Sequence, residues 1–126
     1  MINLYSNLYI QDNSGALIGL CICIFNAKKR LGYLATKIVF VIKKAKTNKK
    51  IKNHEVRDAL ILRISHPTQR TNGIICKSKK NSGILFDPGK KKVYTKIFCT
   101  RIFGPIAQEL RYYHYVKLIM RSPYKY

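Results

Sequence analysis

The sequence predicts a mainly β protein, a small five- to six-stranded β-barrel with a C-terminal pair of short α-helices. Short apolar segments separated by turn residues at near-regular spacing fill most of the chain, which is typical of a small barrel. In the last quarter, the apolar residues change to helical spacing. The chain of 126 residues fits one domain, with the barrel over about residues 1–103 and the helical part over about residues 104–123.

The first half of the chain predicts four strands. The first strand is expected to end at residue 10, and the other three are expected to span residues 17–25, 37–44 and 56–65. The residue types at positions 12–15 indicate a turn, and the nearly continuous apolar character of residues 17–25 indicates a buried strand. Alternate residues of a strand share a face, so Ile38, Phe40 and Ile42 are expected to point the same way.

The second half predicts shorter elements. Brief strands are expected at residues 74–76, 84–86 and 93–98, because glycine-containing turns separate these apolar segments. One short helix is expected over Pro105–Leu110, since proline suits the first helical position. Tyr112, Val116 and Ile119 share one face of a second helix, which Pro123 limits.

Charge is the dominant feature of the composition. The chain carries 25 Lys and Arg residues against 5 acidic residues, a net charge of +20. A small domain needs a net charge of only about 2–8 for solubility, so a basic surface kept for solvation alone explains this excess poorly. Nucleic acid is the expected partner. The longest apolar stretch, residues 16–25, is too short to span a membrane, so no membrane insertion is expected.

The residues that could carry chemistry are scattered. The cysteines at positions 21, 23, 76 and 99 form no Cys-x-x-Cys pair and have no histidine at zinc-ligand spacing. Cys21 and Cys23 are expected on the same side of one strand, as small buried hydrophobes rather than metal ligands or disulfide partners. The sequence contains no nucleophile motif and no glycine-rich phosphate loop. We therefore expect no enzyme activity, no metal and no cofactor.

Basic residues cluster along the chain and form the predicted contacts with nucleic acid. Lysine ammonium groups suit phosphates as point charges, and arginine can bind a phosphate through two parallel hydrogen bonds. A single cluster is explained equally well as a solvated loop, but several clusters in one small domain favour binding. The predicted contact residues are Lys28, Lys29, Arg30, Lys43, Lys44, Lys46, Lys49, Lys50, Lys52, Arg63, Arg70, Lys77, Lys79 and Lys80.

Composition also bears on the cellular compartment. Phe, Tyr, Met, Ile, Asn and Lys, whose codons are AT-rich, supply almost half of the chain, and Met1–Tyr5 contains no basic targeting region. We expect synthesis inside an organelle, a mitochondrion first, with a plastid or the cytoplasm of an AT-rich bacterium as alternatives. The same bias raises the tyrosine content, so the C-terminal tyrosines are expected to pack against the barrel or a neighbouring protein rather than to serve as stacking platforms for bases.

Two motifs resemble those of a known family. Thr100–Arg111, TRIFGPIAQELR, resembles the TRIFGP-x-x-x-ELR signature of the large-subunit ribosomal protein fourteen family, bacterial and organellar branch. Asp12–Ala16 resembles the DNSGA turn of that family, and the spacing of the motifs is similar. The middle of the chain is diverged, and Leu17 and Ile18 stand where two basic residues usually follow this turn.

The resemblance implies a β-barrel with a helical appendage that serves as a structural constituent of the large ribosomal subunit. It implies contacts with large-subunit rRNA, with small-subunit rRNA at a bridge, and with neighbouring large-subunit ribosomal proteins. It also implies docking of the ribosome-silencing factor. The predicted docking residues are Thr100, Arg101, Gly104 and Pro105.

The predicted docking residues lie in one short segment, residues 100–105, which we call the corner, and this segment yields a packing prediction. We expect Arg101 at the surface while Ile102 or Phe103 packs inward, and we expect loss of the Phe103 ring to destabilise the fold. Two other function classes stay open from the residues. One is a free-standing basic barrel that binds single-stranded nucleic acid, such as a translation factor or an organellar RNA chaperone. The other is a protein–protein adaptor that uses the apolar corner around Phe103.

Overall fold

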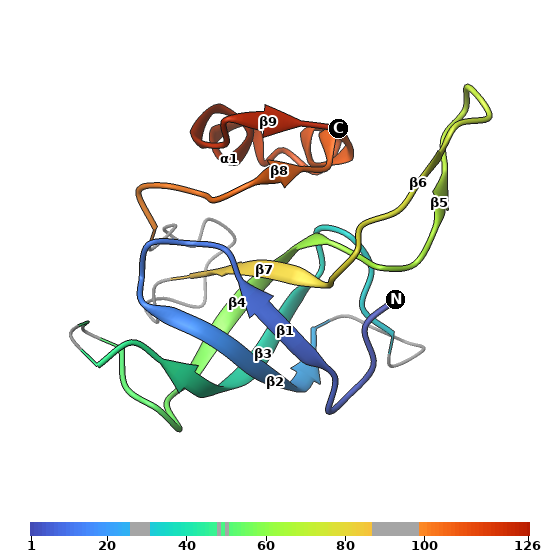
Figure 1. The fold of residues 1–126 in the computed structure, drawn as a ribbon. Coiled ribbons are helices and arrows are strands. Elements are labelled where there is room, and N and C mark those ends of the chain that lie inside the picture. Colours follow the sequence, from blue (N-terminus) through green and yellow to red (C-terminus); the bar gives the residue numbers. More distant parts are fainter. Residues whose placement is uncertain (26–30, 48, 50, 87–98) are drawn as a thin grey trace.

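Five strands close into a barrel in the computed structural model of the chain, which describes residues 1–25, 31–47, 49, 51–86 and 99–126 (Figure 1). The barrel strands are β1 (Asn7–Ile10), β2 (Ala16–Ile24), β3 (Lys37–Ala45), β4 (Val56–Arg63) and β7 (Ser82–Leu85). Neighbours pair antiparallel in the order β1-β2-β3-β4-β7, and a parallel β1–β7 pair completes the closure. Each barrel strand is therefore paired on both sides, and the predicted mainly β fold class is confirmed.

The inside of the barrel is filled by side chains that alternate along its strands. Ile38, Phe40 and Ile42 of β3 are all 0% exposed, as their alternation predicts. Phe40 lies against Gly19 of β2, where an added Cβ would come within 1.9 Å of the ring. A side chain at position 19 would displace the ring, so the close packing of this core requires glycine. The other buried members of this core are Ile2, Leu8, Ile10, Ala16, Cys21, Ile51, Ala59, Ile61, Ile64 and Leu85.

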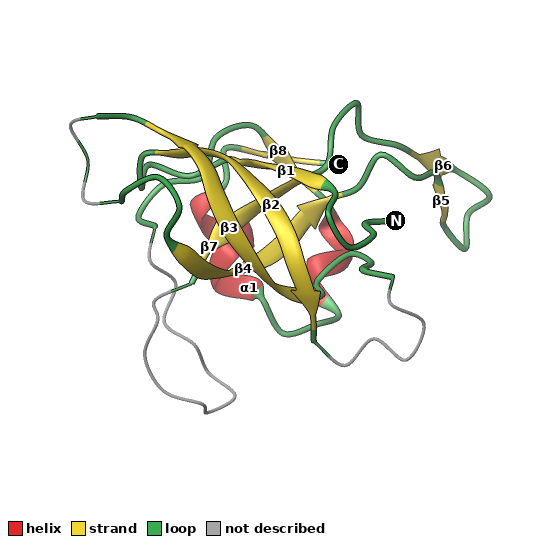
Figure 2. Ribbon diagram, turned by 90° about the horizontal axis from the view of Figure 1, so that it is seen from below, coloured by secondary structure: helices red, strands yellow, loops and turns green. Residues whose placement is uncertain are grey.

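A second apolar core lies between the barrel wall and the C-terminal unit, residues 99–126. This unit contains β8 (Pro105–Ile106), the 3₁₀ helix η1 (Gln108–Arg111), α1 (Val116–Arg121) and β9 (Tyr124–Lys125), and it covers one side of the barrel (Figures 1 and 2). β4 supplies both cores, because Ala59 and Ile61 belong to the inner core while Leu60 and Leu62 belong to the second. The remaining buried members are Ile84, Phe86, Cys99, Ile102, Ile106, Leu110, Leu118 and Ile119.

β1, β3 and β4 each follow the same kind of tight turn. Tyr5, Ala35 and His54 have φ angles of 62°, 61° and 65°, in the left-handed region that non-glycine residues seldom adopt. In the third turn, the His54 N–H donates to the carbonyl of Ile42 at 2.7 Å, and the Ile42 N–H donates to the carbonyl of Glu55 at 3.0 Å. These bonds fix the end of the loop that joins β3 to β4.

A separate ribbon of two short strands projects from the barrel. β5 (Thr68–Gln69) pairs antiparallel with β6 (Ile75–Cys76), and Figure 1 shows this hairpin standing beside the C-terminal unit. Its turn is closed by the Arg70 N–H, which donates to the carbonyl of Ile74 at 2.9 Å. Gly73 follows Asn72 with a positive φ of 76°, which suits glycine.

The C-terminal unit differs from the predicted pair of α-helices. Pro105 begins β8 rather than a helix, because the chain there pairs in parallel with β9, and the Tyr126 N–H donates to the carbonyl of Ile106 at 3.0 Å. The first helix is a 3₁₀ turn, and His114, with a φ of 62°, separates it from α1. Tyr112 lies before α1 and is exposed, and Val116 is exposed too, so the predicted apolar face was right only at Ile119.

Other expectations hold in part. A bulge in the β2–β3 pairing between Cys21 and Cys23 puts Cys21 in the core and leaves Cys23 exposed, so the two do not share a side. β2 is buried along one face only, and Ile22 on it is 39% exposed. The predicted strand at residues 93–98 lies outside the described residues. Within the described part of the chain, no helix has the length and apolar character that a membrane crossing needs.

Candidate nucleic-acid interface

The turn between β1 and β2 is organised by a buried carboxylate. Asp12 is 6% exposed, and one of its carboxylate oxygens accepts from the Ser14 N–H at 2.9 Å and from the Ser14 hydroxyl. The other oxygen accepts from the N–H of Leu85, the last residue of β7, at 3.0 Å. Asp12 therefore ties the turn to the barrel wall, a role that the sequence did not predict beyond turn formation.

The same turn holds the segment that begins the C-terminal unit. Asp12 forms an isolated antiparallel bridge with Ile102. The Asn13 amide donates to the Thr100 hydroxyl at 2.7 Å, and the Thr100 N–H donates back to the Asn13 amide oxygen at 3.2 Å. The Phe103 N–H donates to the carbonyl of Gln11 at 2.9 Å. Two motifs nearly ninety positions apart in the chain are thus neighbours in the fold.

The corner after this bridge presents charged and aromatic groups outward. Ile102 is 3% exposed and belongs to the second core, whereas Phe103 is 53% exposed. The expected inward residue is therefore Ile102, and the expectation that loss of the Phe103 ring destabilises the fold was wrong, because the bridge with Asp12 turns Ile102 inward and its successor outward. Thr100 and Arg101 are exposed.

Gly104 and Pro105 complete the corner by joining it to the C-terminal unit. Gly104 has a φ of 77°, and its carbonyl accepts from the Ser122 hydroxyl at 3.1 Å. Pro105 is exposed and pairs with Tyr124 in the β8–β9 sheet. The corner is therefore held from the barrel side by the turn and from the other side by the C-terminal unit.

The lysine loop, residues 43–52, begins at the end of β3, and its described part lies against the other side of the Asp12–Ala16 turn. The Lys46 N–H donates to the carbonyl of Gly15 at 2.9 Å, and the side chain of Lys49 packs where a Cβ on Gly15 would stand. The exposed lysines described in this loop are Lys43, Lys44, Lys46, Lys49 and Lys52. The loop, the turn and the corner lie along one edge of the molecule (Figure 1).

A second group of exposed lysines, Lys77, Lys79 and Lys80, lies on the link between β6 and β7. The Lys80 ammonium group sits 4.4 Å from the ring centroid of Tyr9, a cation–π distance that holds it on β1. This link lies at the opposite end of the barrel from the lysine loop (Figures 1 and 2). The fold therefore separates the two lysine groups rather than merging them into one patch.

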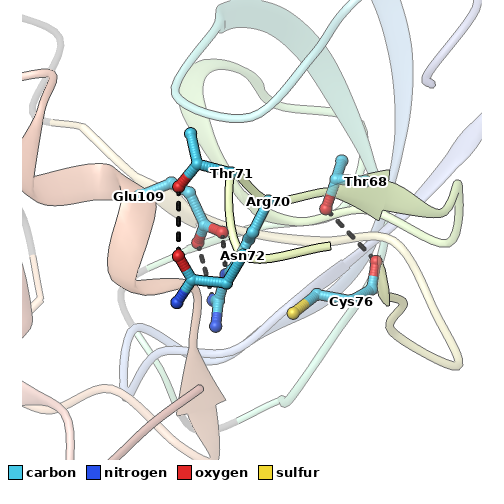
Figure 3. Close-up of polar contacts among 6 residues, drawn as sticks. All are labelled: Thr68, Arg70, Thr71, Asn72, Cys76 and Glu109. Atoms are coloured by element: carbon cyan, nitrogen blue, oxygen red, sulfur yellow. Dashed lines mark hydrogen bonds and ion pairs between the residues drawn. The ribbon is translucent and has the colours of Figure 1, made fainter. Parts of the chain in front are cut away.

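Two predicted contact residues, both arginines, have side-chain hydrogen-bond partners within the chain. Arg63 donates from Nε to the Ser82 hydroxyl at 2.6 Å, and burial lowers the pKa of its guanidinium. Arg70 donates from Nε and Nη2 to the two carboxylate oxygens of Glu109 at 2.6 and 3.1 Å (Figure 3). These bonds raise the pKa of Arg70 and lower the pKa of Glu109, so the pair stays ionised near neutral pH. Sequence reasoning missed both partnerships, which join residues far apart in the chain.

Four predicted contact residues lie outside the described residues. They are Lys28, Lys29, Arg30 and Lys50. Among the described residues, His, Cys, Asp and Glu form no group of three or more that could hold a metal ion.

Comparison with known proteins decides the family. Residues 1–125 match the family model described as ribosomal protein L14p/L23e. The chain belongs to this family. It is also similar to the large ribosomal subunit protein uL14c of Welwitschia mirabilis, with 38% identity over 125 residues that cover 98% of each chain. The family predicted from the two motifs is confirmed, and the chain is a structural constituent of the large ribosomal subunit rather than an enzyme.

Proposed function

We propose that this member of the L14p/L23e family binds large-subunit rRNA at the subunit interface and contributes to a bridge with small-subunit rRNA. The observation that carries the proposal is the edge on which the lysine loop, the Asp12–Ala16 turn and the Thr100–Arg101 corner lie together. The hydrogen bonds among these segments fix the backbone that carries the lysines. Lysine contacts to phosphates position a protein on RNA without reading its sequence.

Two separated lysine groups suit a bridging role. The lysine loop lies at one end of the barrel, and the Lys77–Lys80 link lies at the other (Figure 2). With a net charge of +20, the chain repels itself and gains most from anionic surfaces on more than one side. A barrel held at both ends can lie between two RNA segments, as an inter-subunit bridge requires.

The corner is the proposed docking site for a protein partner. Thr100 is fixed by two hydrogen bonds with Asn13, and Arg101 beside it is exposed. A guanidinium on a fixed backbone loses little entropy when it binds a carboxylate. We propose that a neighbouring ribosomal protein or the ribosome-silencing factor docks here.

The proposed location is an organellar ribosome. Its support is the AT-rich amino-acid composition and the similarity to uL14c of Welwitschia mirabilis. We propose the mitochondrion, with the plastid as the alternative that the same observations allow. Mass spectrometry of large subunits from each purified organelle distinguishes the two.

The salt dependence of RNA binding tests the rRNA-contact proposal. The double variant Lys44→Gln/Lys46→Gln should flatten the slope of log affinity against log salt by about 2 units if each lysine neutralises one phosphate. Lys117→Gln/Lys125→Gln is the matched control, because it removes the same charge from exposed positions of the C-terminal unit. Equal slopes for the two double variants would show that the lysine loop makes no specific phosphate contacts.

A further inference from the structure

An open cleft lies between the β5–β6 hairpin and the 3₁₀ helix η1, away from the lysine loop. Its volume is roughly 490 Å³, within the range of about 300–1,000 Å³ typical of ligand sites. The hairpin turn lines one side with Gln69 and Asn72, and the C-terminal unit lines the other with Gln108 and Tyr112. Apart from one charged pair, the side chains of this cleft are neutral and polar.

The charged pair, Arg70 with Glu109, joins the two sides of the cleft (Figure 3). Each guanidinium–carboxylate bond satisfies both partners, so neither charge is left over for a ligand. The cleft therefore suits a neutral polar group better than a phosphate. Because the pair ties the hairpin to η1, the cleft is also held open in advance of binding.

Tyr112 provides a flat apolar surface at the cleft. Tyr112 is 81% exposed, so packing against the barrel, one of the two uses expected for the C-terminal tyrosines, does not account for it, and the ring is left for a partner outside the chain to cover. In the same cleft, Asn72 accepts from the Thr71 hydroxyl at 3.3 Å through its amide oxygen, and no described residue accepts from its amide nitrogen. An aromatic face and a free amide donor are together the groups that stack on and hydrogen-bond to a nucleobase.

We propose that the cleft receives a single unstacked nucleobase of rRNA, which stacks on Tyr112 and is hydrogen-bonded at its edge by Asn72. The proposal rests on the proposed RNA-binding function and adds a base-contacting site to it. An RNA strand fits the cleft better than a protein segment because exposed cations adjoin it. One of these exposed cations is Arg111, which precedes Tyr112 in the chain. The other is Lys77, which follows Cys76, and Cys76 pairs with Thr68 in the wall of the cleft. Such cations can hold the phosphates on either side of the base.

Binding to two polyanions tests this site in the full chain. The probes are a short oligouridylate, whose bases are free to stack on protein, and inorganic polyphosphate, which carries no bases. Tyr112→Leu should weaken oligouridylate binding by about 5- to 150-fold and leave polyphosphate binding unchanged. Tyr112→Phe, which keeps the ring, should bind both probes as the unmodified protein does. Tyr124→Leu is the matched control, because Tyr124 is 68% exposed but does not line the cleft.

The outcomes separate this inference from the function on which it rests. If Tyr112→Leu binds oligouridylate as tightly as Tyr124→Leu does, the base site is wrong while rRNA binding through lysines stands. If the unmodified protein binds neither probe, the proposed RNA-binding function fails and the base site fails with it. If Tyr112→Leu instead releases a neighbouring protein from assembled large subunits with RNA binding intact, the cleft belongs to a protein and the proposal is overturned.

Discussion

Replacing Ile102 with alanine tests how the corner is built. The side chain is 3% exposed and packs in the second core between the barrel wall and the C-terminal unit. The change removes three buried carbon atoms and leaves a cavity against groups that the Asp12 bridge holds in place. Isoleucine-to-alanine changes at such sites cost about 2–5 kcal/mol. In a domain of this size, that loss should lower the melting temperature by roughly 10 °C.

Phe103→Ala is the matched control one residue away. Phe103 is 53% exposed, so truncation removes about half of the usual burial energy and should cost about 0.8–1.5 kcal/mol. Thermal unfolding followed by circular dichroism compares the two variants under the same buffer conditions. A larger loss for Phe103→Ala than for Ile102→Ala would refute the assigned directions of the two side chains.

Three further predictions concern thiols, acid and docking. Burial raises the pKa of Cys21 to about 11 and that of Cys99 to about 12. A thiol reagent should therefore label exposed Cys23 before either of them. Early labelling of Cys99 would contradict its burial in the second core. The hydrogen bonds from Arg70 lower the pKa of the Glu109 carboxyl. The stabilisation by this pair is therefore complete above the ordinary glutamate pKa of about 4.3, and it is lost as the pH falls through the lowered pKa. Glu109→Gln should therefore cost less than about 1 kcal/mol at pH 7 and nothing in strong acid, and an equal cost at both pH values in urea unfolding would refute the pairing. Arg101→Ala should leave folding and subunit incorporation unchanged but weaken silencing-factor pull-down at least tenfold, since truncating an interface charge costs about 2–5 kcal/mol. Undiminished pull-down would show that Arg101 is not part of the docking site.

Periodicity predicted the barrel well because one face of each strand had to be buried. The alternation of Ile38, Phe40 and Ile42 is a local property, and the structure repeats it without change. The bulge that exposes Cys23 was not predictable, because it depends on the pairing register with β3 and not on β2 itself.

The C-terminal unit shows where prediction of secondary structure from local sequence fails. Pro105 and Ile106 have the residue types of a helix start, but pairing with Tyr124 and Lys125 makes them a strand. That pairing joins segments separated by a helix, and the second core then decides which residues are buried. Sequence reasoning for this part therefore found some of the buried residues, Ile106, Leu110 and Ile119, but gave the wrong backbone and expected exposed Tyr112 and Val116 on the apolar face.

Charge clustering identified candidate contact residues but not the surface that they form. The exposed lysines of the loop were all identified from charge clustering. Their separation from Lys77–Lys80, and the link between Asn13 and Thr100, follow from barrel closure and tertiary hydrogen bonds. Arg70 was expected on nucleic acid, yet its guanidinium is paired with Glu109, which no local pattern indicated.

Sedimentation of organelle extract after a high-salt wash tests the central claim most directly. A constituent of the large subunit that is held by many rRNA contacts should remain in large-subunit particles, at about one copy per particle, and should be absent from small subunits. Release of the chain into the soluble fraction by the wash, with large subunits otherwise intact, would contradict the assembled role and favour a free-standing binder of single-stranded nucleic acid.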